Sequence, residues 1–277
     1  MKRSPLRLLH RGRTLVRYPL FALAALLLFG ATLAAWVFWD LPDVAPLKDR
    51  RATLRIEVPD WQGRMHPLRV GPQNPDWTPL EALPDELKWA VIVAEDANFY
   101  EHKGIDVPAL QEALKHDLKR KRLERGASTI TQQLAKNLFL SRDKSLRRKL
   151  RELVLARRME EGLSKGRILE LYLNVVELGP LVYGAGHGAR HHFGKPASAL
   201  TPAESAFLAA MLPGPRIAFN PETRAPKVRQ RAARILDLLG RRHLLSEDEI
   251  VDGLVQLGRL GGRRQPPQAP TGARRIS

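Results

Sequence analysis

The chain has 277 residues, of which 44% are hydrophobic. This is enough to bury one sizeable core or two modest ones, and it excludes a chain that is disordered throughout. The formal net charge of +17 at pH 7 predicts an anionic partner, such as a membrane surface, a pyrophosphate or a nucleic acid. The chain contains no cysteine, which excludes disulfides, thiolate metal sites and cysteine nucleophiles.

The N-terminal part is predicted to anchor the protein in a membrane. Residues 18–39 form an uncharged, mostly apolar run, long enough to cross about 30 Å of hydrocarbon as a helix. Residues 1–17 are basic and contain no acid, so the positive-inside rule predicts that they stay in the cytoplasm and that the rest is exported. A cleaved signal peptide is the alternative, because small residues at 31–35 resemble a processing site. In both cases the exported location disfavours nucleic acid as the partner.

The remainder of the chain is predicted to divide into three parts. Residues 40–83 are rich in Pro, Asp, Trp and Arg and indicate a juxtamembrane linker, with one strand or hairpin around residues 53–58. Residues 84–260 are predicted to form a single helical domain. Residues 261–277 are rich in Gly, Pro and Arg, which is typical of a disordered tail.

Helix start signals support the helical assignment of the domain. Thr201 and Glu204 form a capping box with proline at the first helical position, and Ser246 and Glu249 form a second box. Ser164 can cap another helix. Further helices are predicted at residues 85–98, 107–121, 129–139, 145–161 and 226–242. The exported domain is therefore predicted to be mainly α.

The predicted helix at 129–139 carries polar residues that a purely structural helix does not require. Thr129 can cap its N-terminus, with Gln132 at the third helical position. Thr129, Gln133 and Lys136 share one face, beside a buried stripe expected at Ile130, Leu134 and Leu138. A hydroxyl, a carboxamide and an ammonium near a helix N-terminus suit an anionic or sugar-rich ligand, because the unpaired amides favour negative charge there. A capped, solvated face is the alternative, and this segment alone does not decide between them.

Two carboxylates are candidates for chemistry. Glu95 follows an apolar helical run, and partial burial there would raise its pKa toward the range of a general base; a solvent-exposed acid at a helix end is the alternative. Glu152 lies four residues after Arg148 and can pair with it, although an ordinary surface ion pair fits the same spacing. His102 is expected to be a structural hydrogen-bonding residue. The other clustered histidines lack an acidic co-ligand, so no metal site is predicted.

Taken together, these segments resemble the glycosyltransferase domain of class A penicillin-binding proteins and its monofunctional relatives, over about residues 80–242. The motif E-D-x-x-F-x-x-H-x-G is matched at 95–104, and G-x-S-T-I-T-Q-Q-x-x-K-N is matched at 126–137. The motif R-K-x-x-E is matched at 148–152, and I-L-E-x-Y-L-N-x-x-x-x-G at 168–179. A single match could arise by chance, but an ordered series at compatible separations could hardly do so.

This resemblance implies a lysozyme-like, two-lobed α-helical fold around a substrate cleft, preceded by one transmembrane helix. It implies an enzyme of the bacterial cytoplasmic (inner) membrane with its catalytic domain outside. The growing undecaprenyl-pyrophosphate glycan would be transferred to the GlcNAc 4-hydroxyl of lipid II, with inversion, forming β-1,4 linkages. Membrane lipids would be further partners, and nucleic acid would not. Other wall-synthesis or division proteins as partners, and a Mg²⁺ or Mn²⁺ ion at the pyrophosphate, are left open.

The resemblance also assigns roles to individual residues. Glu95 would be the general base, and Glu152 would be the second carboxylate. Substrate binding would fall to Asp96, Ser128, Thr129, Gln132, Gln133, Lys136, Asn137, Lys144 and Arg148. Structural roles in the motifs would fall to Phe99, His102, Gly104 and Asn174. Lys144 stands where the family usually has arginine, and a chain of this length implies the monofunctional form without a transpeptidase domain.

Two other classes of protein are weighed against this one. A lytic transglycosylase or lysozyme-type hydrolase would also use a catalytic glutamate, but it would not be expected to carry the segment 128–133 with Lys136 after it. A non-catalytic membrane scaffold for cell-wall synthesis would not depend on Glu95 at all.

Overall fold

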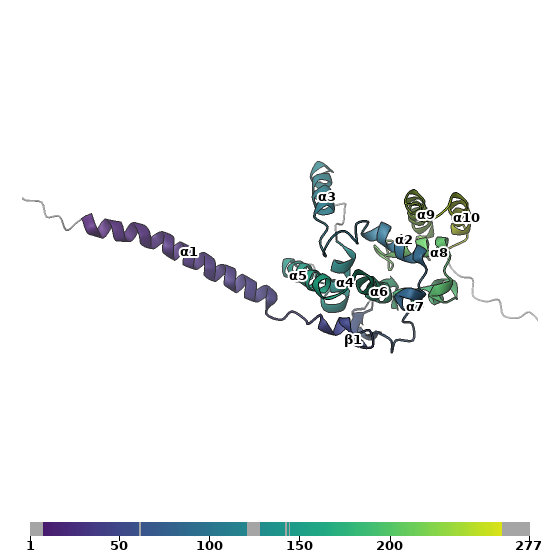
Figure 1. Ribbon diagram of the computed structural model, residues 1–277, viewed down its shortest axis with the longest axis horizontal. Helices are drawn as coiled ribbons and strands as arrows, with labels where there is room; N and C mark the ends of the chain where they lie inside the picture. The colour runs from purple at the N-terminus through teal and green to yellow at the C-terminus, as the bar shows by residue number, and fades with distance from the viewer. Residues whose placement is uncertain (1–7, 61, 121–127, 142, 144, 262–277) are drawn as a thin grey trace, which may run out of the picture.

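The computed structural model describes residues 8–60, 62–120, 128–141, 143 and 145–261. Over these residues the protein is mainly helical (Figure 1), which confirms the prediction of a mainly α protein. In chain order, the elements are α1 (Leu8–Phe38), η2 (Ala45–Lys48), β1 (Leu54–Pro59), β2 (Met65–Val70), η3 (Leu80–Ala82), α2 (Asp85–Glu95), α3 (Val107–Arg120), α4 (Ile130–Phe139), α5 (Leu146–Gly162), α6 (Lys165–Val175), β3 (Glu177–Gly179), β4 (Val182–Tyr183), α7 (Gly184–Phe193), η4 (Ala197–Ala199), α8 (Pro202–Met211), α9 (Ala225–Arg241) and α10 (Glu247–Leu257).

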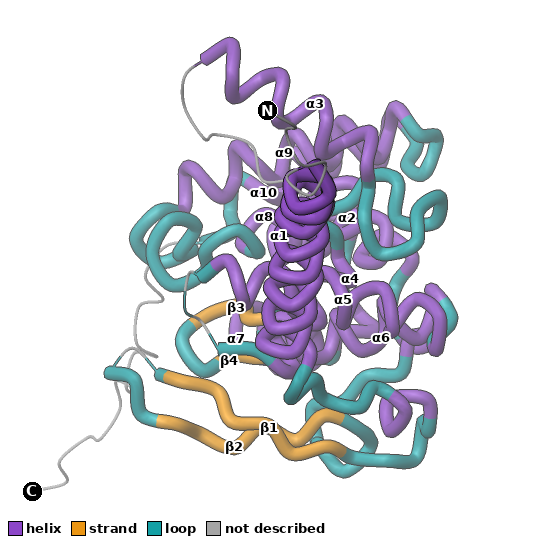
Figure 2. Tube along the Cα trace, turned by 90° about the vertical axis from the view of Figure 1, so that its left-hand side faces the viewer, coloured by secondary structure: helices purple, strands orange, loops and turns teal. Residues whose placement is uncertain are grey.

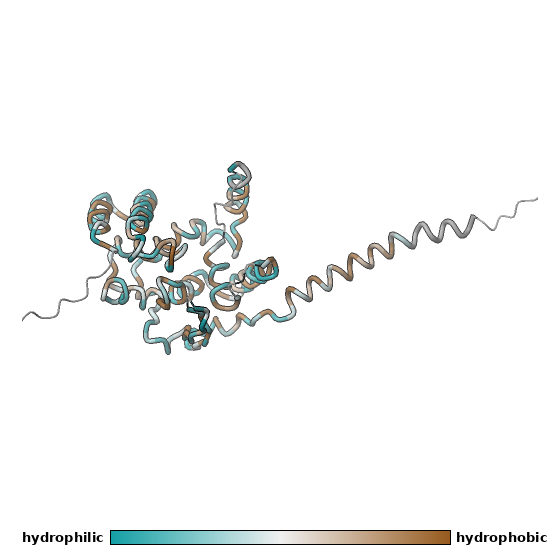
Figure 3. The backbone as a smooth tube through the Cα atoms, turned by 180° about the vertical axis from the view of Figure 1, so that it is seen from behind, coloured by the Kyte–Doolittle hydropathy of each residue, from teal (hydrophilic) through white to brown (hydrophobic). Residues whose placement is uncertain are grey.

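Helix α1 extends away from the body of the protein and is brown with apolar residues along most of its length (Figure 3). Within it, Leu20–Phe38 has a mean hydropathy of 2.3 and is a candidate membrane span, although a signal sequence has the same properties. Nearly all of its apolar side chains are exposed. Burying them in lipid would remove this surface from water, which is the expected role of such a helix.

The chain after α1 forms an antiparallel hairpin of β1 and β2, which pairs Leu54 with Val70. The apolar stretch 53–58 lies largely in β1. Figure 2 looks along α1 onto the body and shows this hairpin at its lower edge. The predicted tail at 261–277 lies outside the described residues, apart from Gly261.

The core of the body is built on α6 and α8, whose residues are almost all buried. Helix α8 packs against α2, α9 and α10, while α4 packs against both α5 and α6. Helix α3 projects from this assembly in Figure 1, and its exposed apolar side chains include Val107, Leu110 and Leu114. The body therefore brings the end of α2 close to α4, α6 and α9, which together position the candidate site.

The helix start signals in the sequence correspond to real caps. Thr129 accepts a hydrogen bond from the Gln132 backbone, and the Thr201–Glu204 box forms as predicted. The predicted helix at 85–98 is too long, because α2 ends at Glu95. Asp96 has φ −161° and ψ 71°, an extended conformation that turns its carboxylate toward the start of α4.

Candidate active site

Glu95 is the last residue of α2, and its side chain is only 11% exposed. Its Oε2 accepts a hydrogen bond of 3.0 Å from Gln133 Nε2, and its Oε1 accepts one of 3.0 Å from Arg231 Nη2. Burial raises the pKa of Glu95, while Gln133, Arg231 and Lys136 act against that rise. The predicted partial burial is therefore present. The Glu95 carboxyl has a raised pKa, and Gln133 and Arg231 hold its two oxygens in a fixed orientation.

Gln133 is itself held in place by Tyr172 of α6. The Tyr172 hydroxyl donates a hydrogen bond of 2.9 Å to Gln133 Oε1, so the amide nitrogen is the atom turned toward Glu95. Tyr172 is completely buried, and burial raises the pKa of its hydroxyl well above the ordinary value. The hydroxyl therefore stays protonated and remains a donor. This fixes the orientation of the Gln133 amide, which accepts from Tyr172 and donates to Glu95.

Asp96 is buried and uses both carboxylate oxygens inside the protein. Its Oδ1 lies 2.8 Å from His102 Nε2, and its Oδ2 accepts a hydrogen bond of 2.9 Å from the backbone nitrogen of Ile130. The Gly104 backbone nitrogen donates to His102 Nδ1 at 3.1 Å, so His102 carries its proton on Nε2 and donates it to Asp96. Asp96 therefore connects the loop after α2 to the N-terminus of α4, where negative charge is favoured.

The same loop is held by two more side chains of the second motif. Thr129 Oγ1 donates to the Gly104 carbonyl oxygen at 2.7 Å, and Gln132 Nε2 donates to the same oxygen at 3.1 Å. Gly104 has φ +86°, and a Cβ there would lie 3.2 Å from the backbone of Ala156, so glycine fits this position. His102 and Gly104 thus both take part in the contacts that hold this loop, and their structural roles stay a prediction.

These contacts change the interpretation of three predicted substrate ligands. Asp96, Thr129 and Gln132 are buried, and each spends its polar atoms on partners within the protein. All three therefore hold the loop and the start of α4 together, and their role in substrate binding stays a prediction. The physical reason is that capping a helix and closing the adjacent loop turns a polar side chain inward.

Glu152 lies between two cations on α5. Its side chain is 4% exposed; Oε2 accepts from Arg148 Nη1, and Oε1 accepts from Lys149 Nζ. Lys149 Nζ also donates to Ser128 Oγ and to Gln132 Oε1, each at 3.0 Å. Arg148 Nε donates to the Asp143 carbonyl oxygen at 2.6 Å. The ion pair expected from the spacing is present; its carboxylate is buried, while the Arg148 side chain remains 18% exposed.

Helix α4 connects the two glutamates. Gln133 contacts Glu95, and Gln132, one residue earlier, contacts the Lys149 ammonium that binds Glu152. Because residues advance by about 100° in an α-helix, Lys136 lies at an angle between those of Gln132 and Gln133. Lys136 is half-buried and acts on Glu95 electrostatically. Each carboxylate therefore has cations of its own: Lys136 and Arg231 act on Glu95, and Arg148 and Lys149 bind Glu152.

The remaining predicted residues occupy varied positions. Phe99 is fully buried beneath Lys165, whose Nζ lies 4.5 Å from the ring centroid. Asn174 holds the backbone of Thr78 from both sides, accepting from its nitrogen and donating to its oxygen at 2.8 Å each. Asn137 is half-buried, and Lys144 lies outside the described residues. Among the described residues, no group of three or more His, Asp or Glu side chains could hold a metal ion.

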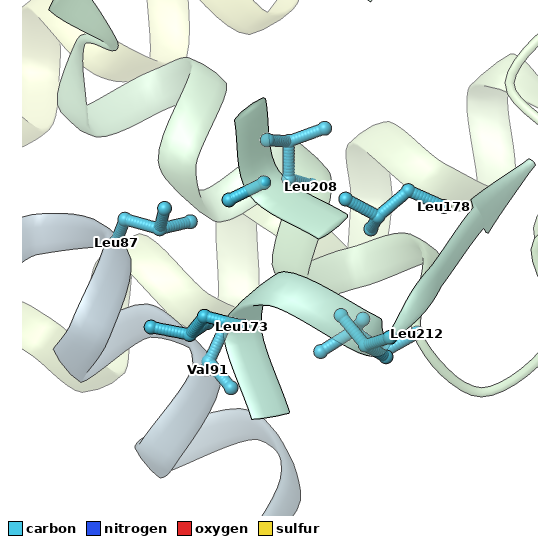
Figure 4. A pocket seen from close by; sticks show the side chains of 8 residues that line it. Leu87, Val91, Leu173, Leu178, Leu208 and Leu212 are labelled. Carbon is cyan, nitrogen blue, oxygen red and sulfur yellow. The ribbon is translucent and has the colours of Figure 1, made fainter. Parts of the chain in front are cut away.

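A small apolar pocket lies elsewhere, among α2, α6, α7 and α8 (Figure 4). It is lined by Leu87, Val91, Leu173, Val176, Leu178, Ala185, Leu208 and Leu212. These are all aliphatic side chains, which supply neither a proton acceptor nor a positive charge. This pocket is therefore a packing feature of the core and is separate from the candidate site.

Three residues of the site were not predicted from the sequence. Lys149 is part of the R-K-x-x-E motif, and its spacing of three from Glu152 could have indicated it. Tyr172 is likewise part of the fourth motif. Arg231 lies 136 residues from Glu95 along the chain, and no local pattern connects the two.

Comparisons with known proteins point to one family. The family model described as "Transglycosylase" matches residues 64–239. A biosynthetic peptidoglycan transglycosylase from Aeromonas hydrophila is 48% identical over 191 residues, which cover 67% of this chain and 80% of that protein. One from Alcanivorax borkumensis is 43% identical over 202 residues, covering 73% and 79%. Among solved structures, penicillin-binding protein 1A from Haemophilus influenzae aligns with 73% of this chain and 20% of that chain, at a TM-score of 0.38 and 19% identity.

Proposed function

This chain belongs to the transglycosylase family, and we propose that Glu95 is the general base with which it polymerises glycan strands. The relatives that it matches over most of their length are biosynthetic peptidoglycan transglycosylases, and the chain is likewise a peptidoglycan glycosyltransferase. Its substrates are the growing glycan and lipid II. The observation that carries the proposed role is the position of Glu95, which is nearly buried and held through both oxygens.

The reaction needs a base because a sugar hydroxyl is a poor nucleophile until its proton is removed. In the proposed step, Glu95 takes the proton of the GlcNAc 4-hydroxyl on lipid II. The oxygen forms a bond to the anomeric carbon of the growing chain, and the bond from that carbon to the undecaprenyl pyrophosphate breaks. Attack from the face opposite the leaving group inverts the α configuration to β. Burial favours this role because it raises the pKa of Glu95.

The leaving pyrophosphate gains negative charge as its bond breaks, and cations near it would stabilise the transition state. Lys136 on α4 and the pair Arg148 and Lys149 on α5 supply that charge. The Lys149 side chain is 39% exposed and the Arg148 side chain 18%, so both can be reached. We propose that Glu152 acts by holding these two cations in place, because both of its oxygens are already bound to them.

A divalent cation at the pyrophosphate would gain little from the protein carboxylates of this site. The oxygens of Glu95, Asp96 and Glu152 each accept a hydrogen bond or ion pair from a protein group. A Mg²⁺ ion needs carboxylate or substrate oxygens arranged around it. Its ligands would therefore come mainly from the substrate, and no step of the proposed mechanism depends on it.

The anchor is joined to the helix that carries the second carboxylate. Arg147 Nε donates to the Trp36 carbonyl oxygen at 3.0 Å, and its guanidinium lies 5.3 Å from the Trp36 ring centroid. Arg151 donates to the Asp40 carbonyl oxygen. We propose a single-pass protein of the cytoplasmic membrane with its N-terminus inside. In this arrangement the end of α1 would hold α5 near the surface from which a polyprenyl substrate extends.

The test is polymerisation of labelled lipid II by the purified full-length chain in detergent. Glu95→Gln should lower the rate at least about 100-fold, because general-base catalysis contributes on this scale, while the circular dichroism spectrum is retained. Glu101→Gln is the matched control, since Glu101 is an exposed glutamate of the same loop, and it should polymerise at the wild-type rate.

Other outcomes would point to the alternative classes. Polymerisation by a folded Glu95→Gln protein would exclude Glu95 as the base. Cleavage of preformed glycan without polymer formation would support a hydrolase or lytic enzyme. Full complementation of cell-wall synthesis in cells by Glu95→Gln would support a scaffold.

A further inference from the structure

We infer that Arg231 is a positioning residue for Glu95, which holds one carboxylate oxygen from α9 while Gln133 holds the other from α4. This inference rests on the proposed role of Glu95 as the base. Neither the motifs in the sequence nor the family match assigns a function to this arginine. The contact of Arg231 with Glu95 follows only from the packing of α9 against α2.

The contacts of Arg231 show that it is fixed to the end of α2 rather than to the carboxylate alone. Its Nη2 donates to Glu95 Oε1 at 3.0 Å and to the Ala94 carbonyl oxygen at 3.2 Å. The second bond places the guanidinium relative to the backbone that carries Glu95. Because one nitrogen joins a backbone oxygen to a side-chain oxygen, the carboxylate cannot rotate freely while both bonds are present.

The local structure also restricts the guanidinium from its other side. Its carbon lies 5.5 Å from the ring centroid of Phe219, in the loop between α8 and α9. That loop is closed by a hydrogen bond of 2.8 Å from the Phe219 nitrogen to the Gly214 carbonyl oxygen. A guanidinium over an aromatic face is stabilised electrostatically. The ring therefore supports Arg231 in the orientation that reaches Glu95.

The register of α9 explains why Arg231 faces the end of α2 whereas Arg234 does not. Its buried stripe comprises Ala225, Val228, Ala232, Ile235, Leu236 and Leu239. Arg231 lies at the edge of this stripe with a side chain 30% exposed, whereas Arg234 is exposed to solvent. Helix α9 packs against both α2 and α8, so residue 231 is the one brought beside Glu95.

The charges around Glu95 show what Arg231 contributes. Lys136 faces the carboxylate from α4, Tyr172 from α6, and Asp96 is its neighbour in the chain. Burial raises the pKa of Glu95, and Arg231 and Lys136 oppose that rise. Tyr172 stays protonated and contributes no charge. Without Arg231, less positive charge would oppose the effect of burial, and the pKa of Glu95 would rise further. Glu95 would then be deprotonated, and able to act as a base, over a narrower pH range.

The test uses three substitutions in the full-length protein: Arg231→Met, Arg231→Lys, and Arg234→Met as a matched control on the same helix. For each variant, kcat and KM for lipid II are measured from pH 5 to pH 9. Arg231→Met should move the acid limb of kcat upward by about one pH unit, as expected for loss of a contacting opposite charge. Its plateau kcat should fall about tenfold because a base that is misplaced by a fraction of an ångström loses rate. KM should change less than twofold, since Arg231 touches no substrate in this proposal.

Arg231→Lys should restore the acid limb close to that of the wild type while recovering only part of the plateau, because lysine keeps the charge and loses the fixed planar geometry. Arg234→Met should match the wild type in both parameters. If Arg231→Met does not fold, the split between charge and geometry in Arg231→Lys decides the question alone.

An unchanged pH profile and kcat in a folded Arg231→Met protein would overturn the inference, as would a rise in KM alone or a loss of rate that is uniform across pH. Failure of the proposed function would give a different result. A folded Glu95→Gln protein that still polymerises lipid II would show that Glu95 is not the base. An inactive Glu95→Gln beside a normal Arg231→Met would refute only the role of Arg231.

Discussion

Asp96→Asn offers a direct test of whether the aspartate beside the proposed base binds substrate or holds the fold together. In the structure, Asp96 accepts from His102 Nε2 at 2.8 Å and from the Ile130 nitrogen at 2.9 Å. Asparagine has one acceptor oxygen and one donor group. If the asparagine oxygen keeps the Ile130 contact, its amide nitrogen faces the Nε2–H of His102, so two donors meet. If the amide is flipped, the amide nitrogen instead faces the N–H of Ile130, and two donors meet there. A change of tautomer at His102 would instead deprive the Gly104 nitrogen of its acceptor.

The expected cost follows from these lost contacts. A hydrogen bond to a charged group contributes about 1.5–3 kcal/mol, and a buried donor without an acceptor costs a further ~1 kcal/mol. The negative charge at the N-terminus of α4 adds about 0.5 kcal/mol or more. We therefore expect the free energy of unfolding to fall by about 3 kcal/mol, which lowers Tm by roughly 6–12 °C for a domain of this size.

The measurement is a thermal melt of the full-length protein in detergent, followed by polymerisation kinetics at a temperature where the variant is folded. Asp106→Asn is the matched control. Asp106 is also buried and caps a helix, accepting from the Ala109 nitrogen, but its other partner is the amide of Asn98. Asn98 can rotate its amide to accept from the new asparagine, so this control should lose less than about 1 kcal/mol.

The reasoning about Asp96 would be refuted by the opposite pattern. A substrate-binding aspartate predicts a tenfold or larger rise in KM for lipid II with an unchanged Tm. A structural aspartate predicts a lower Tm with a near-normal KM per folded molecule.

Two further predictions concern buried hydroxyls. Tyr172→Phe removes the donor that fixes the Gln133 amide. The kcat should therefore fall about tenfold, while the free energy of unfolding falls by no more than about 1 kcal/mol. An unchanged kcat would show that Gln133 needs no such support. Ser205 on α8 is completely buried, and its hydroxyl has no hydrogen-bond partner among the described residues. Ser205→Ala should therefore leave Tm unchanged or raise the free energy of unfolding by about 1 kcal/mol. A lower Tm in the same thermal melt would reveal a contact of this hydroxyl.

The sequence predicts best those features that depend on neighbours along the chain. The capping boxes at Thr201 and Ser246 form as expected, because a cap and its partner are only three residues apart. The end of α2 was placed three residues too late, because Asp96 leaves the helix to satisfy a nitrogen on α4, which no local pattern records. A predicted helix end is thus wrong where a side chain near it binds a group that is distant along the chain.

The same distinction separates the two halves of the site. The pairing of Glu152 with Arg148 follows from a spacing of four on one helix, but the burial of Glu152 does not, since it depends on how α4 packs against α5. Glu95 could be proposed as a base from its place after an apolar run. Its contacts with Gln133 and Arg231 join residues 38 and 136 positions away, and only the assembled fold brings them together.

The dense polarity of α4 has an explanation that the sequence alone did not suggest. Thr131, Gln132 and Gln133 are consecutive, so their side chains point about 100° apart and cannot all line one groove. Each instead reaches a different part of the protein: Thr131 donates to Glu160 on α5, Gln132 to Gly104, and Gln133 to Glu95. The main role of the motif is therefore to make internal contacts, among them those that position the carboxylates of Glu95 and Glu160. On this view, substitutions at 131 and 132 should act through stability, whereas those at 133 and 136 should act through catalysis, because only the latter pair acts directly on Glu95.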